Sequence, residues 1–301
     1  MENVQSQVQY PPSKIWLLAA RPKTLGAAIA PVLMGTAMAW AAGGFHALAA
    51  VCALLGAMFI QIGTNFSNDY SDFLKGADTE ERKGPLRVTQ AGLVTPEAMK
   101  RATVIVFAMA VVAGAYLIWR GGWPILLIGV LSILSGLLYT VGRYSLAYLG
   151  LADLFVLVFF GPVAVGGTYY VQTLMINMVV IMVGFAAGLL SVAILLVNNI
   201  RDVEEDRAAN KKTLVVRAGR SFGVGLYVAC VLVAVLIPIG LYLFTGQHPW
   251  AMTVVLILPL AWPIVRKLRH ECNAMALNPL LGATGRLLLL YSLLFSIGWM
   301  L

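Results

Sequence analysis

The stretch from residue 47 to residue 78, ALAAVCALLGAMFIQIGTNFSNDYSDFLKGAD, runs from apolar residues directly into a cluster of charge. Its first half carries no charged side chain and has the apolar character of a membrane helix. Its second half brings three carboxylates, Asp69, Asp72 and Asp78, and only Lys75 offsets their charge. Charged side chains at the edge of a membrane are costly, and those that occur there usually serve a function. The stretch therefore predicts a membrane helix that ends in a functional site.

The whole chain has the composition of a membrane protein. It contains 301 residues, of which 60% are hydrophobic and 11% are charged, and its mean hydropathy is +0.86. Soluble domains usually carry about 25% charged residues, and one membrane span needs about 20 mainly apolar residues. Runs of this kind recur at 24–42, 46–67, 100–119, 122–141, 150–171, 176–199, 219–243, 249–265 and 285–301. Since no ten-residue alternating segments indicate a barrel, we expect one all-α membrane domain over residues 1–301. It would contain about nine transmembrane helices in a single bundle, after a polar N-terminal segment at residues 1–15.

The basic residues predict the orientation of this bundle. Counted along the nine spans, 20 of the 21 Lys and Arg residues fall on one side, and only Arg120 falls on the other. Basic loops face the cytoplasm, so we expect an integral protein of the cytoplasmic (inner) cell membrane with a cytoplasmic N-terminus. The net charge of +8 then needs no nucleic-acid partner. The three cysteines have no paired spacing and indicate neither a disulfide framework nor a zinc site.

Two clusters of carboxylate and amide side chains share the side predicted to be cytoplasmic, where the long polar segments also lie. Members of each cluster stand three or four residues apart, so each forms one stripe on a helix. The first stripe comprises Asn65, Asn68, Asp69 and Asp72, and the second comprises Asn198, Asn199, Asp202 and Asp206. Four spans separate the two stripes, so both helix ends emerge on the same face, as in a faint internal repeat. The simpler interpretation, two solvated helix ends with capping residues, explains one such cluster better than two in matching register.

The chemistry of these stripes favours a metal-bound phosphate compound. Crowded carboxylates repel one another unless a cation lies between them, and hard oxygen ligands suit Mg²⁺, which one or two carboxylates hold together with substrate phosphates. Lys75, Arg82, Lys83 and Arg87 follow the first stripe, and Arg201, Arg207, Lys211 and Lys212 interleave with the second. Such cations bind the phosphates of a metal-bound polyphosphate, although membrane orientation alone explains most of them individually.

These residues resemble a known family. NDYSDFLKGAD followed by RKGPLRVTQAGLVTPE, and NNIRDVEEDRAANKKTLVVRAG, are similar to the two aspartate-rich regions of the intramembrane aromatic prenyltransferases. RPKTL at 21–25, YTVGR at 139–143 and GLADLFVLVFFG at 150–161 agree with the same family. The resemblance covers about two thirds of the chain and is strongest to the branch that prenylates 1,4-dihydroxy-2-naphthoate for menaquinone synthesis.

The resemblance implies roles for particular residues. In the first motif it places metal–diphosphate ligands at Asn68, Asp72 and Asp78, where the commoner spacing would use position 76, here Gly76. In the second motif it implies Asp202 and Asp206 as ligands. Lys211 corresponds to a lysine that contacts diphosphate, although Asn210 before it is often glycine in the family. The further candidates are Asp69 as a metal ligand, Asn65, Asn198, Asn199, Lys75 and Arg87 as substrate-binding residues, and Tyr139 and Arg143 near the diphosphate and the acceptor.

Asp153 in GLADLF has two interpretations. It would orient the hydroxyl groups of the acceptor, or it would pair with Arg143, and the pairing is the simpler expectation. Arg21 and Lys23 are open to a similar choice between binding the acceptor carboxylate and anchoring the first span.

The implied reaction transfers a polyprenyl group from an allylic polyprenyl diphosphate to 1,4-dihydroxy-2-naphthoate, with loss of CO₂ and with Mg²⁺ as cofactor. The bilayer and these two substrates are the partners that the resemblance implies, and the sequence leaves the oligomeric state and prenyl length open. A phytyl donor, or another aromatic acceptor such as homogentisate, remains an alternative within the superfamily. A cation-coupled transporter is the alternative of a different class, but no acidic residue lies deep within the third, fourth, seventh, eighth or ninth span.

Overall fold

A computed structural model describes residues 10–76, 84, 86–139 and 146–301 of the chain. Within these residues every regular element is a helix, which confirms the predicted all-α class. In chain order the elements are α1 (Pro12–Ala20), α2 (Pro22–Ala41), α3 (Ala47–Leu74), α4 (Pro96–Gly121), α5 (Trp123–Leu138), α6 (Leu146–Leu149), α7 (Ala152–Val158), η1 (Phe159–Val163), α8 (Ala164–Thr173), α9 (Met178–Arg201), α10 (Val203–Ala208), α11 (Leu214–Ala218), α12 (Arg220–Thr245), η2 (Pro249–Ile257), α13 (Leu258–His270) and α14 (Ala274–Met300).

The apolar helices match the nine predicted spans. In the described residues, eight helices are long and apolar enough to cross a membrane, with α7, η1 and α8 forming one of them and η2 with α13 another. The fourth predicted span corresponds to α5, which has only 16 residues. At about 1.5 Å per residue it covers about 24 Å, less than the roughly 30 Å of a bilayer core. The α5 helix ends at Leu138, with Tyr139 as its C-cap residue.

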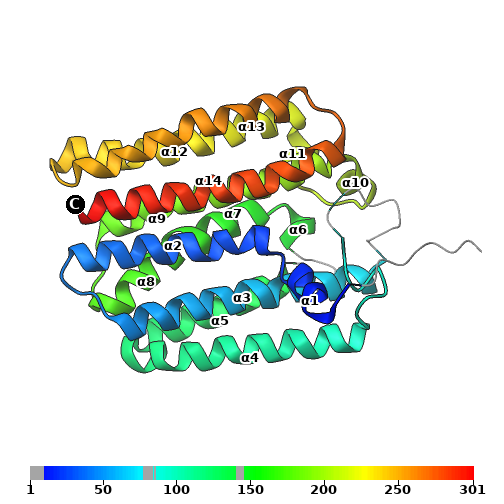
Figure 1. Ribbon diagram of the computed structural model, residues 1–301, viewed down its shortest axis with the longest axis horizontal. Helices are drawn as coiled ribbons and strands as arrows, with labels where there is room; N and C mark the ends of the chain where they lie inside the picture. The colour runs from blue at the N-terminus through cyan, green and yellow to red at the C-terminus, as the bar shows by residue number, and fades with distance from the viewer. Residues whose placement is uncertain (1–9, 77–83, 85, 140–145) are drawn as a thin grey trace, which may run out of the picture.

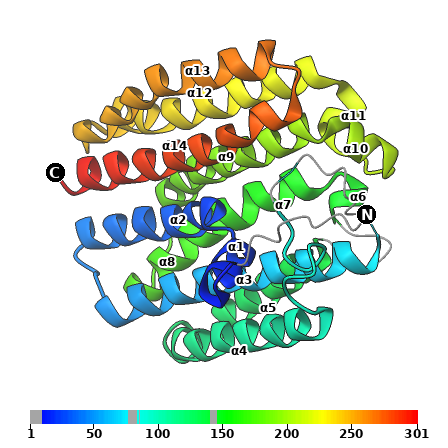
Figure 2. The same ribbon diagram turned by 45° about the vertical axis from the view of Figure 1, so that its right-hand side comes forward.

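The long helices lie side by side along the long axis of the molecule, with α12 and α13 at one edge and α4 at the other (Figure 1). Figures 1 and 2 both place α6, α10 and α11 at the end of the bundle remote from the C-terminus. The C-terminal ends of α3 and α9 reach the same end. We call this end, with α1, α6, α10 and α11, the polar end. Both predicted acidic clusters belong to it, as expected for two helices that run in the same direction.

The α9 helix forms the centre of the bundle. It packs against α2, α7, α8, α12 and α14, and 67% of its apolar window is buried, the highest share among the candidate spans. Small residues permit the closest of these contacts. A Cβ added to Gly188 would overlap the carbonyl oxygen of Leu157 on α7, and one added to Gly184 would lie 2.6 Å from the backbone of Pro162. The first part of the fifth span thus lies directly against the helix that carries the second acidic cluster.

Arg120, the one basic residue on the side predicted not to face the cytoplasm, has a structural role at the end of the bundle opposite the polar end. Arg120, near the end of α4, donates through Nε to the carbonyl of Val171 at 2.6 Å and through Nη2 to that of Gln172 at 3.0 Å. These carbonyls belong to the last turn of α8, where helices leave acceptors without an intrahelical partner. Arg120 therefore has a structural role in joining α4 to α8.

The α1 helix was not predicted, because residues 1–15 were expected to form a polar segment. It ends at Arg21, which has a left-handed φ of +53°, and Pro22 begins α2 directly afterwards. The ring of Trp16 packs on that of Phe66 with centroids 5.6 Å apart. The Asn65 Nδ2 donates to the carbonyl of Ala20 at 2.9 Å. As a result α1 covers the last turns of α3 and helps to bury the first acidic cluster.

Candidate active site at the polar end

The first acidic cluster lies on the last three turns of α3, and its members are buried. Asn65, Asn68, Asp69 and Asp72 have exposed fractions of 2–7%. The two oxygens of Asp69 accept hydrogen bonds from the backbone nitrogens of Val88 and Thr89, at 3.2 and 3.1 Å. Asp69 therefore holds the segment after α3 against the helix, and Asn65 holds the junction of α1 and α2. Both of these contacts are with the protein backbone, and Asp72 is the member of the stripe nearest to the end of α3.

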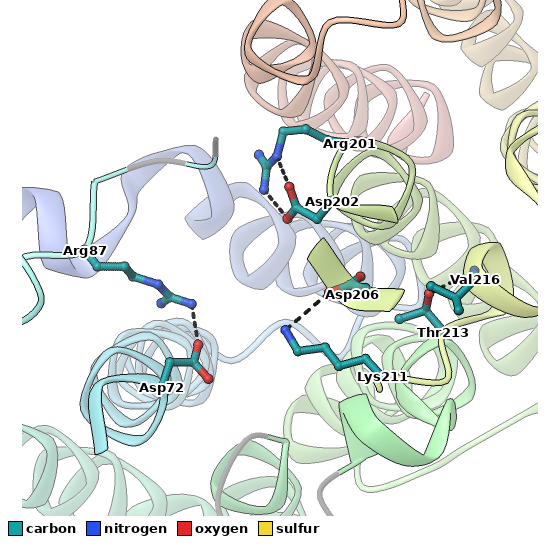
Figure 3. A network of polar contacts seen from close by, with 8 residues as sticks. All are labelled: Asp72, Arg87, Arg201, Asp202, Asp206, Lys211, Thr213 and Val216. Carbon is teal, nitrogen blue, oxygen red and sulfur yellow. Dashed lines mark hydrogen bonds and ion pairs between the residues drawn. The ribbon is translucent and has the colours of Figure 1, made fainter. Parts of the chain in front are cut away.

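Asp72 forms a buried ion pair with Arg87. The Arg87 Nη2 lies 2.6 Å from the Asp72 Oδ2, and the two side chains are 8% and 7% exposed. The hydrogen bonds of Asp69 to the adjacent residues Val88 and Thr89 position this arginine. Low local dielectric strengthens such a pair and makes an uncompensated charge expensive. Arg87 thus supplies the positive charge that this carboxylate requires, as Figure 3 shows.

The second acidic cluster follows the end of α9, and a bend at Asp202 separates α9 from α10. The helical spacing of the second stripe is kept across this bend. The backbone nitrogens of Asp202 and Asp206 still donate to the carbonyls four residues earlier, at 2.9 and 2.8 Å. The carboxylate of Asp202 receives two hydrogen bonds of 2.6 Å from Nε and Nη2 of Arg201. A third nitrogen of Arg201, Nη1, donates to the Asn278 Oδ1 at 3.0 Å. Arg201, which is 6% exposed, therefore ties Asp202 to α14.

Lys211 lies between the two clusters. Its Nζ is 3.3 Å from the Asp206 Oδ1, and in Figure 3 its side chain extends from Asp206 toward Asp72. Burial lowers the pKa of Lys211, but the carboxylates of Asp206 and Asp72 outweigh burial and leave the pKa raised. Burial likewise raises the pKa of Asp206, and Lys211 acts against that shift. The ammonium is therefore retained at the point where both carboxylate motifs act on it.

Tyr148, on α6, brings two lysines together and was not among the sequence candidates. The Nζ of Lys75 lies 4.9 Å from the centre of its ring, and the Nζ of Lys211 lies 5.8 Å from it. Burial and the charge of Lys211 lower the pKa of Lys75, whereas Asp72 raises it. The backbone carbonyl of Tyr148 accepts a hydrogen bond from the Lys212 nitrogen at 3.2 Å. No pattern in the sequence singles out this tyrosine, because its role depends on the docking of α6 against residues 211–217.

Tyr139 lies where α5 ends, within range of both clusters. Burial raises the pKa of its hydroxyl, the negative charges of Asp153, Asp206 and Asp72 raise it further, and Arg21 lowers it. Tyr139 therefore remains a neutral hydrogen-bonding group among charged neighbours. Its predicted companion Arg143 lies outside the described residues, as does Asp78.

Three further candidates occupy different surroundings. Asn198 is half-buried, and its carbonyl accepts the hydrogen bond from Asp202. Asn199 is 7% exposed, and its Nδ2 has no hydrogen-bonding partner among the described residues. Asp153, in the first turn of α7, is 8% exposed, and neither of its oxygens has a hydrogen-bonding partner there. The expected pairing of Asp153 with Arg143 involves a residue outside the described part of the chain.

The donor set at the polar end suits Mg²⁺. In the described residues no three His, Cys, Asp or Glu side chains group closely enough to hold a metal ion by themselves. Proteins usually hold Mg²⁺ through only one or two carboxylates and let substrate phosphates complete its shell. Asp72, Asp202 and Asp206 supply hard oxygen atoms next to Arg87, Arg201 and Lys211. The site therefore fits a cation that arrives with a phosphate-bearing substrate.

Comparisons with known proteins agree with this architecture. The chain is 39% identical over 293 residues to the 1,4-dihydroxy-2-naphthoate octaprenyltransferase of Escherichia coli, and the alignment covers 95% of each of the two chains. It is 37% identical to the protein of that name from Mycobacterium tuberculosis, over 92% of this chain and 94% of the relative. It is also 31% identical to the 2-carboxy-1,4-naphthoquinone phytyltransferase of Synechocystis, over 85% and 82%.

Among solved structures, a UbiA homolog from Archaeoglobus fulgidus bound to DMAPP and Mg²⁺ shares the fold. Its TM-score is 0.60 at 16% identity, over 94% of this chain and 99% of that one. The model of the UbiA prenyltransferase family matches residues 28–299. With its apolar helical bundle and its two acidic motifs at one end, this chain is an integral membrane protein that belongs to the UbiA prenyltransferase family.

Proposed function

We propose that the protein transfers a polyprenyl group from an allylic polyprenyl diphosphate to 1,4-dihydroxy-2-naphthoate, with loss of CO₂. The product is demethylmenaquinol, the reduced form of the demethylmenaquinone of menaquinone biosynthesis. The observation that carries this proposal is the near full-length similarity to naphthoate prenyltransferases. The grouping of both acidic motifs with Arg87, Arg201 and Lys211 at one end of the bundle supports it. We propose the roles of the individual site residues on the same basis.

The reaction breaks the bond between the allylic carbon and the diphosphate oxygen, and the diphosphate leaves with the electron pair. The ring carbon that bears the carboxylate then forms the new carbon–carbon bond. Departure of CO₂ returns the electrons of its bond to the ring and restores aromaticity, so no base has to remove a ring proton. A bound Mg²⁺ would neutralise the charge that develops on the diphosphate, and Asp72, Asp202 and Asp206 are the residues that would hold it.

The chain's own cations assist the same charge separation. Lys211 keeps its proton between Asp206 and Asp72. Lys75 lies within range of the charge of Asp72 and shares the Tyr148 ring with Lys211. Positive groups that are already in place when charge develops need no reorganisation, which is the main source of electrostatic catalysis. We assign Lys211, Lys75 and Arg87 to the donor diphosphate on this basis.

The apolar interior has a second task, which is to keep water from the allylic cation. Asp72 and Asp206 are buried, and the bundle below them is lined by the apolar core that surrounds α9. Excluding water prevents quenching of a reactive intermediate. A helical bundle in a bilayer also accepts a long isoprenoid chain without exposing it to water.

We also propose that the polar end faces the cytoplasm, because 20 of the 21 basic residues fall on its side of the predicted spans. A phytyl donor is the second candidate, since the Synechocystis relative is a phytyltransferase. The two donors differ in the saturation of the hydrocarbon chain, whereas the acidic motifs are assigned to the diphosphate that both donors share.

The experiment supplies membranes containing the protein with 1,4-dihydroxy-2-naphthoate, Mg²⁺ and separate diphosphates of increasing prenyl length, including phytyl diphosphate. Mass spectrometry identifies the products, and 4-hydroxybenzoate serves as a control acceptor. We expect prenylated, decarboxylated naphthoquinol and no product from 4-hydroxybenzoate. Absence of naphthoquinol with every donor, from a protein shown to be folded and inserted, would refute the proposal.

A further inference from the structure

Asp153 is a buried carboxylate that the donor site does not use. It lies in the first turn of α7, is 8% exposed, and neither oxygen has a hydrogen-bonding partner among the described residues. Burying an ionisable group without a partner costs several kcal/mol. Such a group in the interior of a membrane bundle usually marks a functional site. A ligand with a hydrogen-bond donor would supply the partner that the described residues do not.

Asp153 lies deeper in the bundle than the two acidic motifs. Leu157 packs directly against Gly188 of α9, and Asp153 is one helical turn, about 6 Å, closer to the polar end. Along α9, Asp202 lies about 21 Å beyond Gly188 in that direction. Asp153 is therefore about 15 Å below Asp202, on the apolar side of the donor site.

Tyr139 lies between the depth of Asp153 and the depth of the two acidic motifs. The end of α5 is placed by Gly136, whose added Cβ would overlap the hydroxyl of Thr64 on α3. Thr64 lies about 12 Å before Asp72 along that helix, so Tyr139, one turn after Gly136, is also below the donor motif. The charge of Asp153 acts on this tyrosine together with those of Asp72 and Asp206. Tyr139 thus lies within range of the charges of both Asp153 and the donor motif, and Asp153 is the deeper of the two.

An acceptor ring has to lie below the donor motif. The ring attacks the allylic carbon on the side away from the departing diphosphate, hence below the level of Asp72 and Asp202. The carboxylate of 1,4-dihydroxy-2-naphthoate accepts a hydrogen bond from the neighbouring 1-hydroxyl within the molecule. The 4-hydroxyl has no internal acceptor and needs one from the protein.

We propose that Asp153 binds the acceptor by accepting a hydrogen bond from its 4-hydroxyl group, and so fixes the ring below the donor diphosphate. This inference rests on the proposed function. Asp153 acts by binding and orientation, because the loss of CO₂ already balances the electrons and no proton has to leave the ring. Hydrogen bonds to charged groups are stronger than those between neutral ones, so the contact also selects acceptors that carry this hydroxyl.

The test combines a variant with an acceptor analogue. Asp153→Leu removes the accepting oxygens at similar size, and 1-hydroxy-2-naphthoate lacks the 4-hydroxyl but keeps the carboxylate. Ser296→Ala is the matched control, because Ser296 is also buried with no hydrogen-bonding partner in the described part of the chain but lies near the far end of α14. Each protein is assayed with both acceptors, and the KM of the prenyl diphosphate and the thermal unfolding in detergent are measured in parallel.

We expect the wild-type protein and Ser296→Ala to prefer the dihydroxy acceptor by about 10- to 100-fold in kcat/KM. Asp153→Leu should lose that preference, with a loss of similar size for the dihydroxy acceptor and an unchanged KM for the donor. Asp153→Asn, which keeps one accepting oxygen, should fall between the two. Asp153→Leu should unfold at the wild-type temperature or above it, because it removes a buried carboxylate that has no hydrogen-bonding partner among the described residues.

The inference is overturned if Asp153→Leu keeps the wild-type preference, or if it loses activity equally with both acceptors. A fall in its unfolding temperature would instead indicate a structural role and would also overturn it. Failure of the wild-type protein to prenylate the dihydroxy acceptor at all would refute the proposed function, and this inference with it. Wild-type turnover without dependence on Asp153 would refute this inference alone.

Discussion

Replacing Gly150 by alanine tests whether the docking of α6 positions the cations of the donor site. Gly150 joins α6 to α7 with a φ of +75°. A Cβ at this position would come closer than 3.0 Å to the backbone carbonyl oxygen of Lys212. A backbone oxygen cannot rotate away as a side chain can, so the two segments must separate by about 1 Å to restore ordinary contact.

The structure sets the size of the expected effect. A left-handed φ costs a residue with a side chain about 1–2 kcal/mol. Separation of the segments also weakens the hydrogen bonds from the Lys212 nitrogen to Tyr148 and from Arg217 to the carbonyl of Leu149, at 3.2 and 2.9 Å. Each is worth about 1 kcal/mol, so the total is about 3–4 kcal/mol. Since Lys211 adjoins the displaced segment, and a misplacement of about 1 Å can cost about 10²-fold in rate, we expect a loss of that order.

Gly43→Ala is the matched control. Gly43 has a φ of +72°, no atom lies within 4 Å of its added Cβ, and it is at the end of the bundle opposite the donor site. Prenyl-transfer rates at saturating substrate and thermal unfolding in detergent are compared for the two variants. Gly43→Ala should lose only stability, by the strain of its backbone, whereas Gly150→Ala should lose about 10²-fold in kcat as well. Equal rates in the two variants would refute the positioning of Lys211 through α6.

Further predictions concern the metal, the loop and the orientation. Asp72→Asn and Asp202→Asn each remove a carboxylate charge and should lower kcat by about 10²–10³-fold; near wild-type rates in folded, inserted variants would argue against their role. A chelator should abolish turnover and added Mg²⁺ restore it, and full activity in excess chelator would exclude the metal. Asn210 has a φ of +56°, so Asn210→Gly should keep activity and raise the free energy of unfolding by up to about 1 kcal/mol. Unfolding in detergent measures this change, and a loss of activity would contradict the prediction. Single cysteines at Lys75 and Arg207, in a background without other cysteines, should resist an impermeant reagent in intact cells and react after lysis. Labelling before lysis would show the opposite orientation.

The helical bundle follows from the sequence because its physical requirements are local. A span must contain enough consecutive apolar residues to cross the bilayer, and its backbone must satisfy its own hydrogen bonds. Counting such runs therefore predicted the eight long apolar helices and the shorter α5 of the described residues. The number of spans between Asp72 and Asp202 placed both motifs at one end of the bundle, as the ends of α3 and α9 confirm. The described helix of the fourth span ends at Leu138, with Tyr139 as the C-cap residue of α5, and the last two predicted residues of this span lie outside the described residues.

Only the tertiary structure decided which groups meet at that end. Spacing along a helix tells which face a carboxylate occupies, but not which cation from another element neutralises it. Asp69 and Asp72 are neighbours on one stripe of α3, yet one holds backbone nitrogens and the other holds Arg87. The placement of Tyr148 beside two lysines and the burial of Asp153 depend in the same way on contacts between distant segments. Charge and apolarity are properties of single residues, so they can be determined from the sequence. Whether two residues interact depends on the distance between them in the folded chain, and only the packing of the helices sets that distance.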